Sequence, residues 1–322
     1  MKRQLVLLPL VLAFLVAACV SGSGGLGPIG SAPPSAEPSV PVGSPDLTPE
    51  PSPTPTAPGG TPVPSEPPAS SPAETMIVRA YFYLGGEQGS EGLVPVLRVV
   101  PKTVAVARTA MLALIEGPQA PERDANPGLS SAVPAGTKLL GLSIDQGVAT
   151  VDLSREFESG GGSRSMMVRL GQVVYTLTQF PTVESVRFQV EGRTITVFGS
   201  EGILLAGPIG RAATMFEDLL PAIFVDRPAW GAAIGNPARV TGNSNVFEAQ
   251  FLITLFDASG RKLFEGPVMS ECGTGCRGDF AVTIDYDVDE GQWGTLRAWN
   301  ASARDGSPED IRDYPVWLTP AG

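Results

Sequence analysis

Half of the chain's prolines lie in one stretch, and that stretch limits where a fold can form. Residues 19–75 hold 16 of the 32 prolines and are otherwise mostly Ser, Gly, Ala and Thr. No Lys or Arg occurs between Arg3 and Arg79. Such a segment has too little apolar surface to offset the entropy of folding, so we predict a disordered tether with polyproline II character. At about 3.1 Å per residue, the rise of polyproline II, its upper reach would be roughly 170 Å.

The first residues carry the features of a secretory signal. Lys2 and Arg3 precede an apolar run that ends in two alanines and Cys19. A membrane-spanning helix needs about 20 apolar residues, and this run is shorter. The Val-Ala-Ala-Cys sequence that ends at Cys19 is similar to the bacterial lipobox, in which the cysteine is acylated and becomes the first residue of the mature protein.

We therefore predict that residues 1–18 are a lipoprotein signal peptide and that Cys19 is the site of lipid attachment. Acyl chains at Cys19 would hold the protein in the lipid bilayer. The protein would then lie outside the cytoplasm, on the outer face of the cytoplasmic membrane, with the tether reaching into the cell wall. An ordinary signal peptide with a chance cysteine is the alternative.

The other two cysteines, Cys272 and Cys276, flank Gly-Thr-Gly. Outside the cytoplasm such a pair predicts a disulfide, and the glycines allow the sharp turn that it needs. Two thiols are too few for a zinc site, which normally has four ligands. Free thiols are the alternative.

Charge and histidine content exclude several classes of function. The formal net charge is −11, which makes a nucleic-acid partner unsuitable because few cations are present to replace counterions on phosphates. The chain has no histidine, which excludes Ser-His-Asp and Cys-His catalysis and removes the usual imidazole ligands of zinc. We predict no enzymatic activity, no cofactor and no metal.

Residues 76–210 have the pattern of an α+β domain in which two helices pack on a mixed sheet. The expected order is a strand pair, a helix, a hairpin, a second helix and a second hairpin. The hairpins are expected to turn at Gly147 and Gly192. The helices are expected to bury two stripes: Val104, Ala107, Met111, Leu114 and Met167, Leu170, Val174, Leu177.

Three glycines at 160–162 precede the second helix. A glycine-rich loop before a helix can bind phosphate, but the P-loop ends in Gly-Lys-Ser/Thr and this loop lacks the lysine. We predict a plain connection, with Ser163 or Ser165 as the N-cap.

Several segments of this domain resemble the GerMN domain of sporulation and germination lipoproteins. They are "LVPVLRVVP", "LIEGP", "SAVPAGTKLLGLSIDQGVATVDLS" and "QVVYTLTQFPTVESVRFQVEG". The resemblance runs from about Ile77 to Pro208. Because the family is similar to ring-building motifs of envelope assemblies, the resemblance implies contacts with other proteins rather than catalysis.

The pattern of residues 221–322 predicts an all-β, immunoglobulin-like sandwich, because short segments of alternating apolar and polar residues are separated by turn sequences. In the segment "NVFEAQFLITLFDASG" one face is expected to carry Phe247, Ala249, Phe251, Ile253 and Leu255. Together with "GDFAVTIDY" and "ASARDGSPEDI", this segment resembles the immunoglobulin-like domain of bacterial spore germination, which commonly follows a GerMN domain.

Two further groups of residues are candidate sites. Calcium is conceivable where carboxylates gather, but they are expected to form the wet face of a strand and a turn: Asp285, Asp287, Asp289 and Glu290. Tryptophans can form a sugar-binding platform, although burial is their commoner fate: Trp230, Trp293, Trp299 and Trp317.

The sequence thus predicts a membrane-anchored envelope lipoprotein, related to sporulation and germination proteins. It would act as a non-catalytic scaffold that contacts envelope proteins through the GerMN-like domain. The alternative is a lipoprotein that binds the cell-wall glycan, peptidoglycan. An exposed tryptophan pair in a groove would favour glycan binding, and a flat apolar patch on the first domain would favour the scaffold.

Overall fold

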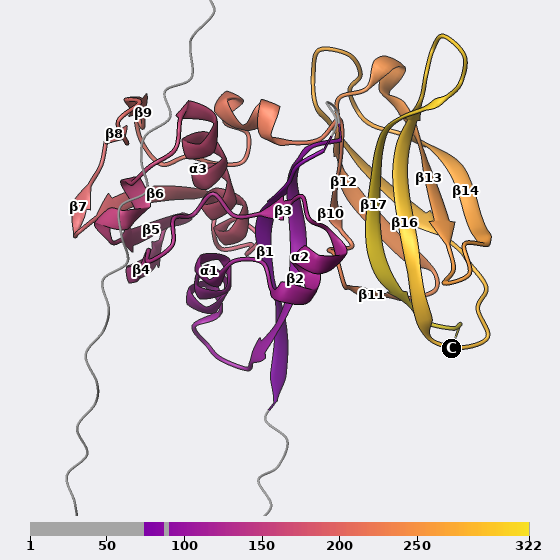
Figure 1. Ribbon diagram of the computed structural model, residues 1–322, viewed down its shortest axis with the longest axis horizontal. Coiled ribbons are helices and arrows are strands. Elements are labelled where there is room, and N and C mark those ends of the chain that lie inside the picture. Colours follow the sequence, from indigo (N-terminus) through magenta and orange to yellow (C-terminus); the bar gives the residue numbers. More distant parts are fainter. Residues whose placement is uncertain (1–73, 87–89, 322) are drawn as a thin grey trace, which may run out of the picture. The chain divides into compact units, whose positions relative to one another are not determined.

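The computed structural model describes residues 74–86 and 90–321, which belong to one compact unit, Pro67–Gly322. Figure 1 shows the course of the chain. The predicted signal peptide, Cys19 and nearly all of the predicted tether lie outside the described residues. Within these ranges no helix is both long and apolar enough to cross a membrane.

The first module, residues 74–220, is α+β, and its strands form separate sheets instead of a single one. β1 (Thr75–Leu84) pairs antiparallel with β2 (Gly92–Pro101), and the short β3 (Leu129–Ser130) adds to the other edge of β1. A second sheet has the order β4-β5-β6-β7 and is mixed, since β5 and β6 run parallel. Its strands are β4 (Leu139–Asp145), β5 (Val148–Leu153), β6 (Ser185–Val190) and β7 (Arg193–Thr194).

The two predicted hairpins are present at their predicted turns. Gln146 and Gly147 both have positive φ between β4 and β5, and so do Glu191 and Gly192 between β6 and β7. This combination is the two-residue turn that matches the twist of paired strands. Alternate residues of β5 are fully buried: Ala149, Val151 and Leu153.

Helices α1 (Val106–Glu116) and α3 (Ser163–Leu177) are the two predicted helices, and a short α2 (Ala120–Ala125) follows α1. Val104 precedes α1 and is fully exposed, so its place in the buried stripe was wrong. α3 contacts β1, β2 and β6, and it is therefore buried on most sides from Met166 to Leu177, more widely than the predicted stripe. Its N-cap is Gly162, which has no side chain to cap with, so the prediction of a serine cap was also wrong.

A short 3-10 helix, η1 (Arg155–Glu158), lies between β5 and α3. The first module ends in three short elements: β8 (Val197–Phe198), β9 (Ile203–Leu204) and η2 (Thr214–Leu219). η2 packs on α3 and β2. At the start of β2, a Cβ atom on Gly92 would lie 2.6 Å from the carbonyl oxygen of Leu219, so only glycine permits this approach.

The second module is β-rich and consists of two sheets, consistent with an immunoglobulin-like fold. One sheet has the order β10-β12-β15: β10 (Ile223–Arg227), β12 (Ala238–Ser244) and β15 (Gly278–Ile284). The other has the order β11-β17-β16-β13-β14: β11 (Ala233–Ile234), β17 (Pro308–Leu318), β16 (Gln292–Ala301), β13 (Gln250–Phe256) and β14 (Lys262–Met269). All of these pairs are antiparallel except β11 with β17.

The core of the second module lies between its two sheets. Phe251 meets Phe280 edge-on with ring centroids 4.8 Å apart, and Ile253 and Leu255 are fully buried. Phe247 does not join them, because it lies in the 3-10 turn η3 (Phe247–Ala249) before β13 and is 59% exposed. The predicted alternation therefore holds only from Phe251 onward.

Candidate functional site

Side chains of α3 and of the turn after it cover the part of the β1 edge that β3 leaves unpaired. The side chain of Gln179 accepts from the Arg79 amide at 2.9 Å and donates to the Arg79 carbonyl at 2.7 Å. One turn earlier, Thr176 Oγ1 accepts from the Tyr81 amide at 3.2 Å, and Gln172 donates to the Tyr81 carbonyl at 3.0 Å. These side chains satisfy backbone groups that a neighbouring strand would otherwise bind. Gln172 and Thr176 are one turn apart on α3, which places them on one helix face, and Gln179 lies in the turn just after the helix ends at Leu177.

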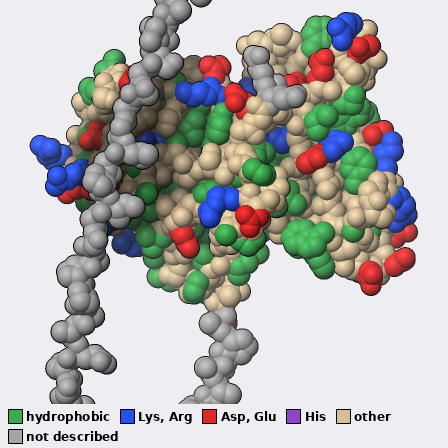
Figure 2. All heavy atoms as spheres, in the orientation of Figure 1, with side chains coloured by type: hydrophobic (Ala, Val, Ile, Leu, Met, Phe, Trp, Pro, Cys, Tyr) green, Lys and Arg blue, Asp and Glu red, His purple; other side chains and the backbone are tan. Residues whose placement is uncertain are grey.

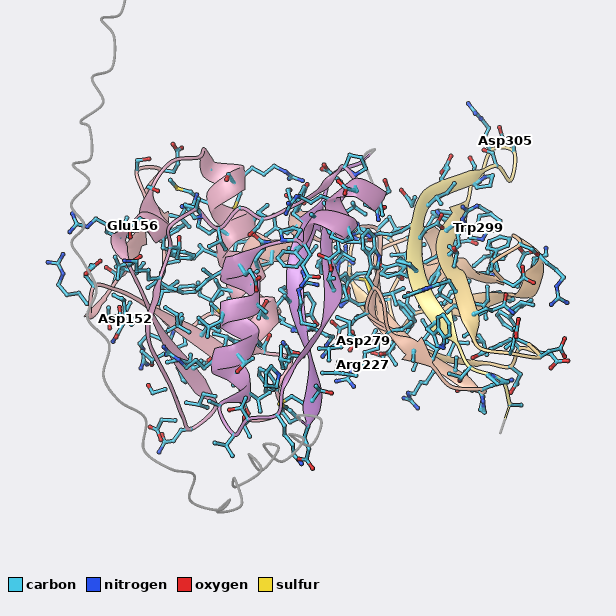
Figure 3. The ribbon with its side chains drawn as sticks, turned by 60° about the horizontal axis from the view of Figure 1, so that its bottom comes forward. Asp152, Glu156, Arg227, Asp279, Trp299 and Asp305 are labelled. Carbon is cyan, nitrogen blue, oxygen red and sulfur yellow. A yellow bond between two sulfur atoms is a disulfide. The ribbon has the colours of Figure 1, made fainter. Side chains whose placement is uncertain are left out.

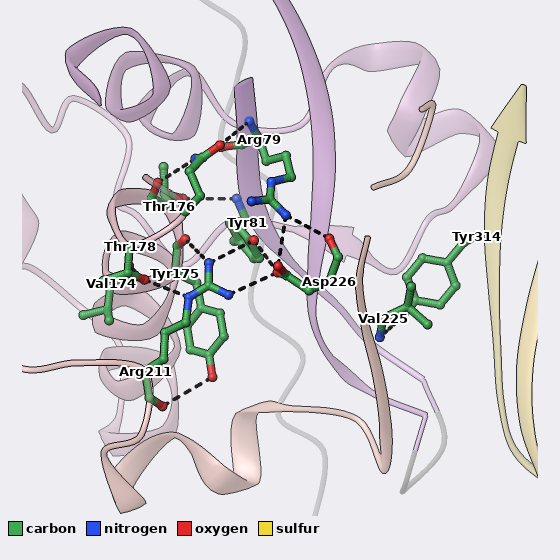
Figure 4. Close-up of polar contacts among 11 residues, drawn as sticks. Arg79, Tyr81, Val174, Tyr175, Thr176, Thr178, Arg211, Val225, Asp226 and Tyr314 are labelled. Atoms are coloured by element: carbon green, nitrogen blue, oxygen red, sulfur yellow. Dashed lines mark hydrogen bonds and ion pairs between the residues drawn. The ribbon is translucent and has the colours of Figure 1, made fainter. Parts of the chain in front are cut away.

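A buried polar network continues from this edge to the second module (Figure 4). The Asp226 carboxylate, on β10, receives Arg79 Nη1 at 3.0 Å, Arg211 Nη1 at 3.2 Å and the Tyr81 hydroxyl at 2.5 Å. Arg211 also donates to Thr178 Oγ1 at 2.8 Å, and its guanidinium lies 4.6 Å from the Tyr175 ring centroid. The network therefore joins β1, α3 and the segment before η2 to the first strand of the second module.

The network fixes the ionisation of its members. Burial would raise the pKa of Asp226, but the guanidiniums of Arg211 and Arg79 and the hydrogen bond from Tyr81 outweigh it and hold that pKa below its usual range. Burial raises the pKa of the Tyr81 hydroxyl, and it raises the pKa of Tyr175 to about 12. Both phenols are therefore protonated at neutral pH and serve as hydrogen-bond donors.

Arg312, on β17, is a second contact between the modules. Its side chain is fully buried and donates to the backbone carbonyls of Ser90, Gly92 and Leu93 at 2.5, 3.1 and 3.0 Å. Burial lowers the pKa of this guanidinium. The backbone of Trp230 adds to the joint, since it bonds to Pro95 and Leu97 of β2 at 2.9 and 3.0 Å.

A cleft of about 810 Å³ opens beside the network. Tyr175, Arg211 and Asp226 line the cleft, and so does Arg277, which directly follows the Cys272–Cys276 loop. Arg277 donates to Asn243 Oδ1 at 3.1 Å and to the Pro221 carbonyl at 3.0 Å, and burial lowers its pKa. A cleft of this size with convergent polar groups is the usual form of a ligand site, but each guanidinium here already has protein partners.

The predicted site residues have different outcomes. Cys272 and Cys276 form a disulfide, with Cα atoms 5.9 Å apart, in the loop between β14 and β15. Cys19 is not among the described residues, so lipid attachment stays a prediction. In the described ranges, no three carboxylate or cysteine side chains gather as metal ligands. Asp285 and Asp287 alternate, exposed, with buried Tyr286 and Val288 beyond the end of β15.

The four tryptophans separate into two groups. Trp230 is buried. Trp299, labelled in Figure 3, lies on β16 and is half-buried, and its indole N–H donates to Thr254 Oγ1 at 2.9 Å. Trp293 and Trp317 are 52% and 36% exposed. Their ring centroids lie 5.5 Å apart at an angle of 85°. The structure therefore contains an exposed tryptophan pair, on the outer face of the five-stranded sheet.

Sequence reasoning missed the joint between the modules. Arg79 and Asp226 are 147 residues apart, and neither stands out from other charged residues in its segment. One signal was available: the string "QVVYTLTQF" contains Gln172, Thr176 and Gln179 at helical spacing beside apolar residues, which indicates polar groups on a buried helix face.

Comparisons with known proteins identify the two modules. Residues 79–196 match the Germane family, described as sporulation and spore germination. Residues 222–307 match the Gmad2 family, described as the immunoglobulin-like domain of bacterial spore germination. Neither is a known catalytic family. No curated protein matches the chain.

Three solved structures are similar to parts of the chain. The first GerMN domain of the sporulation protein GerM from Bacillus subtilis has 21% identity over 42% of this chain and 98% of that one, with a TM-score of 0.35. The tandem GerMN domains of GerM have 15% identity over 66% of this chain and 62% of that one, with a TM-score of 0.36. A protein assigned as a lipoprotein from Clostridium perfringens has 19% identity over 44% of this chain and 93% of that one, with a TM-score of 0.31.

Proposed function

We propose, from the premise that the chain carries a GerMN domain followed by the immunoglobulin-like domain of bacterial spore germination, that it is an envelope scaffold. In this proposal the protein is anchored through acylated Cys19 to the outer face of the cytoplasmic membrane. The segment before β1 acts as a spacer, and the GerMN domain contacts another envelope protein without catalysis.

The observation that carries the proposal is an apolar groove on the first module. The groove has a volume of about 420 Å³ and lies between the start of α1 and β4. It is lined mainly by apolar side chains: Val104, Ala107, Leu142, Ile144, Phe180 and Pro181. Figure 2 shows hydrophobic side chains gathered over the part of the first module that contains α1.

The strand beside the groove supports a protein as its occupant. Among the described strands, β4 is the outermost of its sheet and pairs with β5 alone, so its outer edge presents backbone donors and acceptors. An added strand from a partner would bind these groups, while its apolar side chains would enter the groove. Such an edge is a recognised docking element that free monomers tend to protect.

The joint with the second module supports a scaffold role in another way. Asp226 and Arg312 tie both modules together through buried polar contacts. When a load or a bound partner displaces one module, the other module then moves with it as a rigid body. This coupling is what a spacer between envelope components requires.

The test is photocrosslinking in cells. A photoreactive residue placed at Val104 or Ile144, in the groove, should give adducts to one envelope protein. The same residue at Leu204, which is exposed on β9 of the same module, is the matched control and should give none. Equal adduct patterns from all three positions, or adducts to wall fragments alone, would contradict the proposal.

A further inference from the structure

The outer face of the five-stranded sheet is rich in apolar side chains. On β16 and β17 alternate residues face away from the core, and Trp293 lies directly opposite Trp317. Farther along β17 the same face carries Pro315 and then Ile311, which is 40% exposed. From Trp317 to Ile311 the face extends about 20 Å along the strand.

The tryptophan pair is held in place before any ligand arrives. Trp317 belongs to a strand paired on both sides, with β11 and β16. Its ring packs on the backbone of Gly291, where a Cβ atom would come within 3.0 Å of the indole. The ring of Trp293 packs against the ring of Trp317 in an edge-to-face contact. Rings fixed in this way lose little conformational entropy on binding.

Polar groups lie beside the rings. Arg297, on the same face of β16, donates from Nε and Nη2 to Asp313 at 2.7 and 2.8 Å, and its guanidinium stacks on Phe256 at 5.4 Å. Both members of this ion pair are more than a third exposed. Within the described part of the chain, Nη1 of Arg297 makes no hydrogen bond, so a donor remains for a ligand.

These features together match the chemistry of a glycan. A pyranose ring has a face of C–H groups, which the electron-rich face of an indole attracts, and a rim of hydroxyls, which a guanidinium–carboxylate pair can bind as donor and acceptor. Two ion pairs lie on this sheet, Arg297 with Asp313 and Lys262 with Glu265. Given the chain's net charge of −11, a neutral glycan fits this face and a polyanion does not.

We propose that Trp293 and Trp317, with the Arg297–Asp313 pair, form a binding site for the neutral glycan strand of the cell wall. The site lies on the second module, whereas the scaffold contact proposed above lies on the first. Glycan binding and the protein contact can therefore fail independently of each other.

The experiment uses the full chain with Cys19→Ser, which removes the acylation site. Binding is measured by co-sedimentation with purified peptidoglycan sacculi and by calorimetry with a soluble N-acetylglucosamine tetramer. Trp293→Ala and Trp317→Ala should each weaken binding by at least about tenfold, as loss of an aromatic anchor does. Phe247→Ala is the matched control, since it removes an exposed aromatic of the same module that is 59% exposed, and it should bind as the parent does.

Circular dichroism establishes that each variant is folded. If Trp317→Ala does not fold, Trp293→Ala and Arg297→Gln carry the test. Absence of sacculus binding by the parent, or equal binding by Trp293→Ala and Phe247→Ala, would overturn the proposal. So would a tryptophan-dependent dimer, or a protein partner captured through this face in place of glycan.

Discussion

Replacing Asp226 with asparagine should weaken the joint between the two modules. The carboxylate balances two guanidiniums, and the side chains of Arg79, Asp226 and Arg211 are only 11%, 21% and 28% exposed. Each charge pair is worth about 4 kcal/mol at an effective dielectric constant of 20, and much of that offsets desolvation. Removing one partner of a buried pair typically costs about 3–5 kcal/mol.

We expect Asp226→Asn to lower the free energy of unfolding by about 3 kcal/mol, the lower end of this range, because Arg211 keeps some contact with solvent. For a folded unit of this size, that loss corresponds to a decrease in Tm of about 6–12 °C. Because Asp226 lies at the joint, the variant should also unfold less cooperatively, with the two modules separating into distinct transitions.

The effect should depend on pH in a defined direction. The pKa of Asp226 is lowered in the folded protein, while an unfolded Asp titrates near about 3.9. The unfolded chain therefore binds more protons in the intervening range, so the stabilisation is complete above the unfolded pKa and is lost as the pH falls through the folded pKa. The difference between parent and Asp226→Asn should be constant from neutral pH to about pH 5 and shrink below about pH 4.

Urea titrations at several pH values, followed by tryptophan fluorescence and circular dichroism, measure both quantities. Asp289→Asn is the control, because Asp289 is exposed on the same module, and it should change the free energy of unfolding by no more than about 0.5 kcal/mol. A cost below about 1 kcal/mol for Asp226→Asn at neutral pH would refute the reasoning. So would a cost that persists undiminished in acid.

Three further outcomes are expected. Gln172→Leu leaves the Tyr81 carbonyl without its donor and should lower the free energy of unfolding by about 2–3 kcal/mol; unchanged urea stability would argue against the α3 contact. The double variant Cys272→Ser/Cys276→Ser opens a loop of sequence separation 4 and should cost about 2 kcal/mol in calorimetry under oxidising conditions, and no cost under reducing conditions. Cys19→Ser should move the protein from the membrane fraction to the soluble fraction on cell fractionation, and retention in membranes would exclude lipid as the anchor.

Local features of the fold could be predicted because their causes lie within a few residues. The turns at Gly147 and Gly192 need positive φ, which glycine adopts freely. The alternation of β5 follows from the two-residue period of a strand. The errors at Val104, the α3 cap and Phe247 are all at the ends of elements, where a pattern continues in the sequence after the regular backbone has stopped.

Some features of the candidate sites could be predicted from the sequence, and others could not. The disulfide could be predicted from spacing and compartment, whereas the roles of the four tryptophans could not. Trp230 is buried and Trp293 is exposed, although both occur in similar Gly-containing segments. Which indole faces solvent depends on strand register and on which sheet covers it, and those are set by pairs such as Trp293 with Trp317.

The sequence by itself determined the order of the two domains, the hairpin turns, the disulfide pair and the absence of histidine chemistry. Only the tertiary structure decided that Arg79, Asp226 and Arg312 lie at the joint between the modules, the first two partly buried and the third fully buried. The physical reason is that a charged side chain has the same local preference in a solvated loop and in an ion-paired core. Its burial depends on partners that approach from more than a hundred residues away, and folding alone brings them together.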